Sequence, residues 1–152
     1  MNKTTTTASN LILSDLNDAQ IKQLVLMTFQ GEELPTSNED VGELEEYGDY
    51  LVLTDSEADE AAKDAILDSA WAFNPSFLSS ETGIDEEVFE AIQDNGRCES
   101  NNDAILSCIA DEDSFVEAAI AADGRGHFLA TYDGNENEQE FNGQTYYIYR
   151  TN

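Results

Sequence analysis

The sequence predicts an α+β fold, with about five helices packed on a small antiparallel sheet that ends in a C-terminal three-stranded meander. Apolar residues recur at spacings of three and four through most of the chain, which is the period of amphipathic helices. From His127 onwards the pattern alternates instead. This last part also contains the dipeptides Asp133-Gly134 and Asn142-Gly143, which favour tight turns. Helices followed by hairpins are typical of the α+β class.

The size of the chain indicates one domain. Its 152 residues, of which 40% are hydrophobic and 9% aromatic, are enough to bury one core. We expect residues 1–12 to be a flexible N-terminus and residues 13–152 to form a single domain. The chain starts with MNKTTTTASN, which lacks the apolar centre of a signal peptide, and no apolar run approaches the roughly 20 residues that span a bilayer. We therefore expect a cytoplasmic protein.

The elements before residue 54 are predicted to be a helix, an acidic loop and a strand. Asn17 and Gln20 have the spacing of a helix cap, and Gly31 is a typical helix end. Residues 32–48 form the loop, whose acidic clusters include Glu43, Glu45 and Glu46. Residues 50–53, YLVL, are a continuous apolar run and predict a buried strand.

Residues 54–73 form the clearest helix of the sequence. Thr54 stands at the N-cap position and Glu57 follows three residues later, which is the spacing of a capping box. Small and apolar residues at helical spacing predict one buried stripe. The stripe consists of Ala58, Ala62, Ala65, Ile66, Ala70 and Phe73.

Three further helices are predicted between residues 85 and 124. The first begins near Asp85, the second covers residues 100–109, and the third runs from Asp111 or Asp113 to Gly124. The apolar face of the first consists of Val88, Phe89 and Ile92.

The C-terminal part predicts three strands. They cover residues 127–132, 136–141 and 144–150, with Asn142-Gly143 as a type I′ turn between the last two. The strand at residues 50–53 would join this sheet on an edge.

The charge of the chain is extreme. It has 33 Asp and Glu residues against 6 Lys and Arg residues, for a net charge of −27. Self-repulsion on this scale opposes folding. Direct binding to nucleic acid is excluded, because the chain has no basic patch to release counterions from phosphates. Anionic membrane surfaces are excluded for the same reason.

The helix at residues 54–73 concentrates this charge in an acidic row about 16 Å long. The acidic row consists of Glu57, Glu60, Asp64 and Asp68. Like charges three or four residues apart each cost a few tenths of a kcal/mol, so the row weakens its own helix. A solvated face is the plain explanation for such a row. A binding surface is the alternative, because carboxylates roughly 5–6 Å apart approximate successive phosphates of a nucleic acid.

A second row and the acidic loop extend this candidate surface. The second row consists of Asp85, Glu86, Glu87 and Glu90, and the loop adds Glu43, Glu45 and Glu46. Acids in the first turn of a helix also have a structural reason, since the helix dipole favours them there.

No catalytic, cofactor or metal site is predicted. The segment 133–140, DGNENEQE, fails the EF-hand pattern. His127 lies between two glycines and a strand, where a structural turn is a better account than a catalytic loop. Cys98 and Cys108 are expected to be reduced thiols, with Cys108 buried in an apolar helix.

Two stretches resemble small bacteriophage and prophage proteins of unknown role. They are YLVLTDSEADEAAKDAILDSAWAFNPSFL at residues 50–78, and ADGRGHFLATYDG at residues 122–134 followed by YYIYR at residues 146–150. The resemblance implies a mobile-element protein that acts in the cytoplasm of a bacterial host. Small acidic proteins in that setting are similar in role to DNA mimics of the anti-restriction and anti-CRISPR kinds.

The leading hypothesis is a non-enzymatic inhibitor that occupies the DNA or RNA groove of a basic host defence protein. The oligomeric state is left open, a dimer included. One alternative is an accessory or structural protein whose charge serves solubility in high salt. Another is a small enzyme that uses carboxylates and His127, and a third is a module that binds a basic partner without mimicking nucleic acid.

Overall fold

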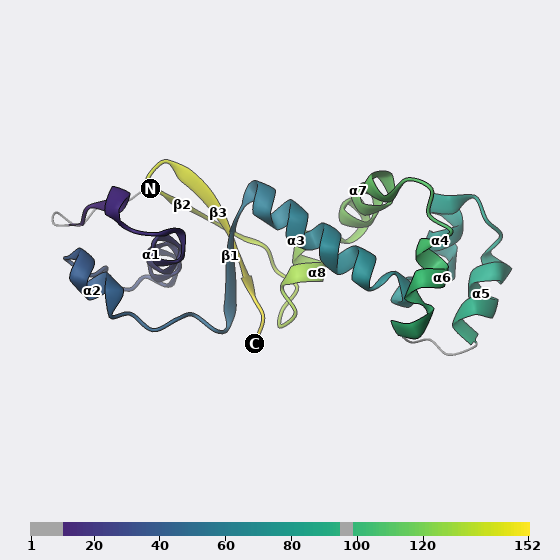
Figure 1. The fold of residues 1–152 in the computed structure, drawn as a ribbon, viewed down its shortest axis with the longest axis horizontal. Coiled ribbons are helices and arrows are strands. Elements are labelled where there is room, and N and C mark those ends of the chain that lie inside the picture. The colour runs from purple at the N-terminus through teal and green to yellow at the C-terminus, as the bar shows by residue number, and fades with distance from the viewer. Residues whose placement is uncertain (1–10, 95–98) are drawn as a thin grey trace. The chain divides into compact units, whose positions relative to one another are not determined.

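The computed structural model describes residues 11–94 and 99–152, and it is an α+β structure (Figure 1). The described part contains eight α-helices and one three-stranded antiparallel sheet. It divides into two compact units, one formed by the residues up to Ala58 together with Leu129–Asn152, and the other by Asp59–Phe128. Of the predicted flexible N-terminus, residues 1–10 lie outside the described residues. The single domain over residues 13–152 stays a prediction.

The sheet lies in the first unit and has the strand order β1-β3-β2 (Figure 1). Its strands are β1 (Tyr50–Thr54), β2 (Asn137–Phe141) and β3 (Gln144–Arg150). Asn142 and Gly143 both have positive φ, 51° and 80°, as a type I′ turn requires. The predicted hairpin and the predicted place of the residue-50 strand on an edge are confirmed.

Helix α1 (Asp18–Gln30) covers one face of this sheet. It begins with the predicted capping box of Asn17 and Gln20 and ends at Gly31, whose φ is 75°. The first unit also contains the short 3-10 helix η1 (Leu13–Asp15) and helix α2 (Asn38–Gly42). Its buried core combines residues of α1, α2 and the sheet, namely Leu24, Val25, Leu26, Val41, Val52, Phe141, Tyr146 and Ile148.

The second unit is helical. After α3 (Asp55–Asp68), which contributes residues to both units, come η2 (Ala70–Ala72), α4 (Pro75–Thr82), α5 (Glu86–Asp94), η3 (Glu99–Asn101), α6 (Asn102–Leu106), α7 (Glu112–Asp123) and α8 (Arg125–Leu129). Asp111 and Gly124 are the N-cap and C-cap of α7, as predicted. The core consists of Ile66, Ala70, Leu78, Phe89, Ile105, Phe115, Val116 and Ala119.

The helix predicted over residues 54–73 ends earlier, at Asp68. The side chain of Asn102 holds the break, because its amide N–H donates to the Leu67 carbonyl (2.9 Å) and its oxygen accepts the Trp71 N–H (3.0 Å). The Ser69 hydroxyl also donates to the Ala65 carbonyl (2.6 Å). These bonds satisfy backbone groups at the helix end that a longer helix would have paired.

The strand predicted over residues 127–132 is wrong, because residues 125–129 form helix α8. Gly124 has φ 83° and ψ 155°, and this conformation lets the chain leave α7 and begin α8 at once. Leu129 and Ala130 are both buried, which a strand with alternating faces cannot provide. The C-terminal meander therefore has two strands, and β1 supplies the third strand of the sheet.

Four smaller differences concern single residues and short helices. Val88 is exposed on α5 rather than buried, while Phe89 is fully buried. The helix predicted over residues 100–109 divides into η3 and α6. Cys108 is a half-buried free thiol, and Cys98 lies outside the described residues. The helix count exceeds five because α2, α4 and α8 are too short to show a sustained helical period in the sequence.

Candidate functional site

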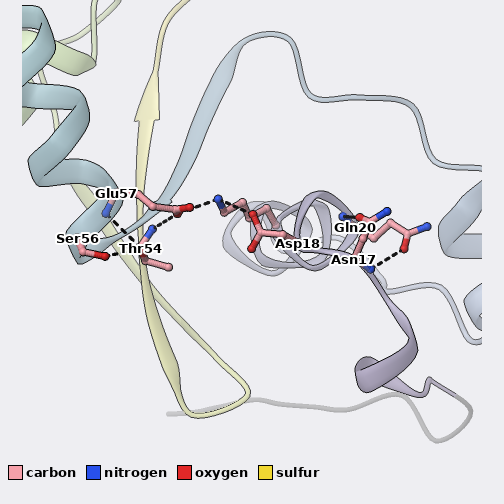
Figure 2. A network of polar contacts seen from close by, with 7 residues as sticks. Asn17, Asp18, Gln20, Thr54, Ser56 and Glu57 are labelled. Atoms are coloured by element: carbon pink, nitrogen blue, oxygen red, sulfur yellow. Dashed lines mark hydrogen bonds and ion pairs between the residues drawn. The ribbon is translucent and has the colours of Figure 1, made fainter.

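Helix α3 is fixed at its start by the predicted capping box. The Thr54 N–H donates to the Glu57 carboxylate (2.9 Å), and the Glu57 N–H donates to the Thr54 hydroxyl (3.3 Å). Figure 2 shows these two bonds at the junction of β1 and α3. The cap places the first residue of the acidic row shortly after edge strand β1, of which Val52 alone is buried, so the predicted buried strand is buried at one residue.

Glu57 also makes an ion pair, which sets it apart from the rest of the acidic row. The Lys22 ammonium lies 2.8 Å from the Glu57 carboxylate and 2.9 Å from that of Asp18. Only 7% of Lys22 is exposed. The hydrogen bond from Lys22, followed by that from the Thr54 N–H, lowers the pKa of Glu57 below its ordinary value. Glu57 therefore has a structural role in the first unit.

Lys22 stays charged in this arrangement. Burial by itself would lower the pKa of its ammonium, but the hydrogen bonds to Glu57 and Asp18 outweigh that effect and the pKa is raised above its ordinary value. A charged ammonium with two carboxylate partners satisfies the rule that a buried charge must be paired.

Glu60, Asp64 and Asp68 are the exposed part of the acidic row. At about 100° per residue, the four acids of the row lie within about 80° of one another around the helix axis. The opposite side of α3 is buried through Ala58, Ala62 and Ile66, which have no exposed surface. Among the described residues, Glu60, Asp64 and Asp68 make no ion pair. They form a continuous strip of exposed carboxylates, of which Glu60 is partly balanced by the charge of Lys63.

The cations near α3 lie on its flank instead. Lys63 contacts Asp113 of α7 at 3.0 Å, and Arg125 of α8 contacts Asp59 at 2.9 Å. Both pairs bind α3 to its neighbours within the second unit. Apart from the Lys22–Glu57 pair and a longer-range attraction between Lys63 and Glu60, the acidic row has no counter-charge from the described cations.

The remaining described cation, Arg150, is also used within the protein. Its guanidinium lies 3.9 Å from the centre of the Tyr132 ring, and its Nε donates to the Asn152 carbonyl (2.9 Å). Together with Lys22, Lys63 and Arg125, it accounts for every Lys and Arg in the described ranges. The described surface therefore offers no group of cations to a phosphate backbone.

The second acidic row lies on α5 and is exposed along its whole length. Asp85 precedes the helix, and its carboxylate accepts the Glu87 N–H (3.0 Å), so it serves the helix start. Glu86, Glu87 and Glu90 point into solvent. Helix α5 packs mainly against α4 and α6. The second row is therefore a surface of its own on the second unit.

Glu43, Glu45 and Glu46 are exposed and belong to the first unit. The segment that carries them follows α2, and the Gln23 side chain donates to the Glu45 carbonyl. The acids of this segment, those on α3 and those on α5 therefore lie on three separate elements. Among them, the acidic row on α3 is the one whose cap and buried stripe both follow from the sequence.

Sequence reasoning missed a cluster of phenylalanine rings in the second unit. Phe73 lies 5.5 Å from Phe77, 5.4 Å from Phe115 and 6.0 Å from Phe128, measured between ring centres. His127 stands edge-on to Phe128 at 4.9 Å. The predicted strand at residues 127–132 hid this cluster, because a strand there would have sent Phe128 to the sheet.

Within residues 11–94 and 99–152, no group of three or more His, Cys, Asp or Glu side chains is arranged to hold a metal ion. None of the described helices has the length and apolarity to cross a bilayer. No family model, no curated protein and no solved structure matches the chain with significant similarity.

Proposed function

We propose that this protein is a non-enzymatic inhibitor that occupies the DNA- or RNA-binding groove of a basic host protein and mimics the nucleic acid. The partner would be a nucleic-acid-binding protein of a bacterial defence system, and the site of action would be the host cytoplasm. No cofactor or metal takes part in this function.

The observation that carries the proposal is the exposed strip on α3. Glu60, Asp64 and Asp68 lie on one face of a capped helix, and none of them forms an ion pair with a described cation, although Lys63 acts on Glu60 at longer range. A helix holds such charges at fixed spacings, roughly 5–6 Å apart, whereas charges on a loop would be mobile. A groove lined by arginines can therefore contact several carboxylates at once without the entropy loss of ordering a mobile segment.

The strip has an energetic cost that the fold does not recover. Each like-charged pair at this spacing destabilises a helix by a few tenths of a kcal/mol. The one cation on α3, Lys63, pairs with Asp113 and acts on Glu60 only at longer range, although a lysine at position 64 would relieve the repulsion. A surface that is unfavourable for folding and useful for binding is the expected pattern of a functional site.

The total charge supports the same proposal through association kinetics. A net charge of −27 attracts a basic partner over a long range and raises the association rate at low salt. It also repels nucleic acid, so the inhibitor would compete with the natural ligand and would not join its complex. The resemblance to phage and prophage proteins agrees with a host target.

A competition pull-down tests this function. The tagged protein would be used to capture partners from bacterial lysate at low ionic strength, without competitor and with an excess of duplex DNA or of RNA. We expect one or a few basic nucleic-acid-binding proteins to be captured and then released by the DNA. Captured proteins that duplex DNA and RNA both fail to release would contradict mimicry, because such proteins bind the inhibitor outside their nucleic-acid groove.

A further inference from the structure

The second unit contains a pocket of about 620 Å³ beside helix α3. Its volume lies in the range of roughly 300–1,000 Å³ that is usual for ligand sites. Residues of α3, α4, α7 and α8 line it together with the segment between α3 and α4. The lining residues are Ala65, Ser69, Ala72, Phe73, Asn74, Phe77, Ala122, Asp123, His127 and Phe128.

The wall of this pocket is aromatic. Phe73 and Phe128 are stacked, with ring planes 7° apart and ring centres 6.0 Å apart. Phe77 completes the wall, and its ring centre lies 5.5 Å from that of Phe73. The ring of buried Phe115 packs against both of these rings, at 5.4 Å from Phe73 and 5.7 Å from Phe77. Such rings offer apolar contact and a negative face to a flat cation.

The one charged carboxylate in the pocket lining is Asp123, an exposed residue at the last position of α7. The other polar lining residues are Ser69, which directly follows the last residue of α3, Asn74, which is the N-cap of α4, and His127. The C-terminal ends of α3 and α7 and the Asp123 carboxylate favour a cationic ligand, while the N-terminal end of α4 acts in the opposite direction. The net charge of −27 also favours a cation and opposes any anion.

The pocket and the acidic row share helix α3. Ala65 and Ser69, which line the pocket, follow Asp64 and Asp68 directly in the sequence. One residue corresponds to a step of about 100° around the helix. A chain that lies along the exposed strip can therefore turn a side chain into the pocket.

We propose that this pocket receives an arginine side chain of the basic partner, and this inference rests on the proposed function. The planar guanidinium would stack on the phenylalanine wall and donate hydrogen bonds to the Asp123 carboxylate. Lysine fits less well, because its compact, strongly hydrated ammonium can neither stack nor donate in a fork. The pocket would supply specificity for arginine, and the acidic row would supply attraction to any cation.

Two peptides of equal charge separate these contributions. The probes are a heptalysine peptide and the same peptide with arginine at its central position, titrated into the isotope-labelled protein at low ionic strength. We expect the arginine peptide to bind about fivefold more tightly, which corresponds to about 1 kcal/mol of cation–π and hydrogen-bond energy. The ring signals of Phe73, Phe77 and Phe128 should shift with the arginine peptide alone.

Two single substitutions supply the matched comparison. Asp123→Asn should remove most of the preference for arginine. Glu138→Gln changes the charge equally at an exposed position on β2, so it should leave the preference intact. Equal affinity of the parent protein for the two peptides would overturn the pocket proposal, and so would an arginine preference that Asp123→Asn leaves unchanged.

A variant of the acidic row distinguishes failure of the pocket from failure of the proposed function. Glu60→Gln, Asp64→Asn and Asp68→Asn together should weaken both peptides while the preference for arginine persists. A preference for arginine without any loss of affinity in this variant would support the pocket and contradict the role of the row. If the triple variant lost affinity for both peptides and the parent protein showed no preference for the arginine peptide, the result would support the role of the row and contradict the pocket proposal.

Discussion

Lys22 and Glu57 form an ion pair of 2.8 Å that connects helix α1 to the start of helix α3. The same Glu57 carboxylate accepts the Thr54 N–H, so one side chain both caps a helix and anchors it to the rest of the first unit. One acid of the candidate surface is therefore a structural residue. The distinction between Glu57 and its three exposed neighbours leads to the first two predictions.

Glu57→Gln should destabilise the protein, whereas Glu60→Gln should not. Glutamine can still accept the Thr54 N–H in a capping box, so this change removes the ion pair and keeps the cap. Because 43% of the Glu57 side chain is exposed, solvent screens the pair and we expect a loss of about 1 kcal/mol. Urea unfolding of both variants at neutral pH measures this. If Glu60→Gln lowered the free energy of unfolding as much as Glu57→Gln does, the structural role proposed for Glu57 would be refuted.

The loss caused by Glu57→Gln should depend on pH in a defined direction. Lys22 holds the pKa of Glu57 in the folded protein below its ordinary value of 4.5. The ion pair therefore contributes fully above pH 4.5, and its contribution is lost as the pH falls through the lower folded pKa. The difference in unfolding free energy between parent and variant should be full at about pH 7 and should shrink steadily as the pH falls below 4.5. A difference that stays constant as the solution is acidified would show that the ion pair is not its cause.

Local patterns of the sequence predicted the helix caps and the hairpin because their partners lie close together in the chain. Asn17 and Gln20 are three residues apart, and Asn142-Gly143 sets its own turn. The end of α3 could not be predicted in this way. Asn102, which pairs with the backbone on both sides of the break, lies 35 residues beyond Leu67.

The candidate site was likewise predictable where its residues lie close together in the chain, and not where they come from distant elements. The spacing of Glu60, Asp64 and Asp68 on one helix face follows from the helical period, and the structure leaves all three exposed. The partners of Glu57 and Lys63 were not predictable, since they come from α1 and α7. The phenylalanine pocket was also hidden, because four helices bring its residues together.

Low ionic strength tests the alternative that the charge serves solubility in high salt. A protein adapted to high salt should be largely unfolded in dilute buffer, since its repulsion is then unscreened. We expect this protein instead to melt cooperatively and well above room temperature in about 10 mM buffer, as buried cores support both units. Circular dichroism during heating measures the transition. Loss of the helical signal at room temperature on dilution would favour the salt-adaptation alternative.

His127→Ala tests the alternative of a small enzyme. The imidazole is exposed and contacts the edge of Phe128, so its removal should change stability by less than about 0.5 kcal/mol. His127 also lines the proposed arginine pocket, so its removal should weaken partner binding at most slightly, and inhibition at saturating protein should remain because the proposed function involves no proton transfer. A variant that keeps its fold and its partner binding but loses its biological activity would show that His127 has a chemical role.

Neutralising the exposed strip should separate stability from binding. In the triple variant Glu60→Gln, Asp64→Asn and Asp68→Asn, each removed repulsion returns a few tenths of a kcal/mol, so stability should stay level or rise by up to about 1 kcal/mol. A control variant, Glu33→Gln with Glu138→Gln and Glu140→Gln, removes three exposed charges from the first unit. Both variants have the same net charge, so a difference between them in partner binding shows the effect of where the removed charges lie.

The association rate with the captured partner, measured for these two variants across a range of salt concentrations, tests the central claim most directly. The account predicts that the triple variant on α3 associates more slowly than the control and shows a flatter dependence on salt, since fewer carboxylates meet the basic groove. Equal association rates for the triple variant and the parent protein at low salt would contradict it, and the acidic row would then be a solvated face.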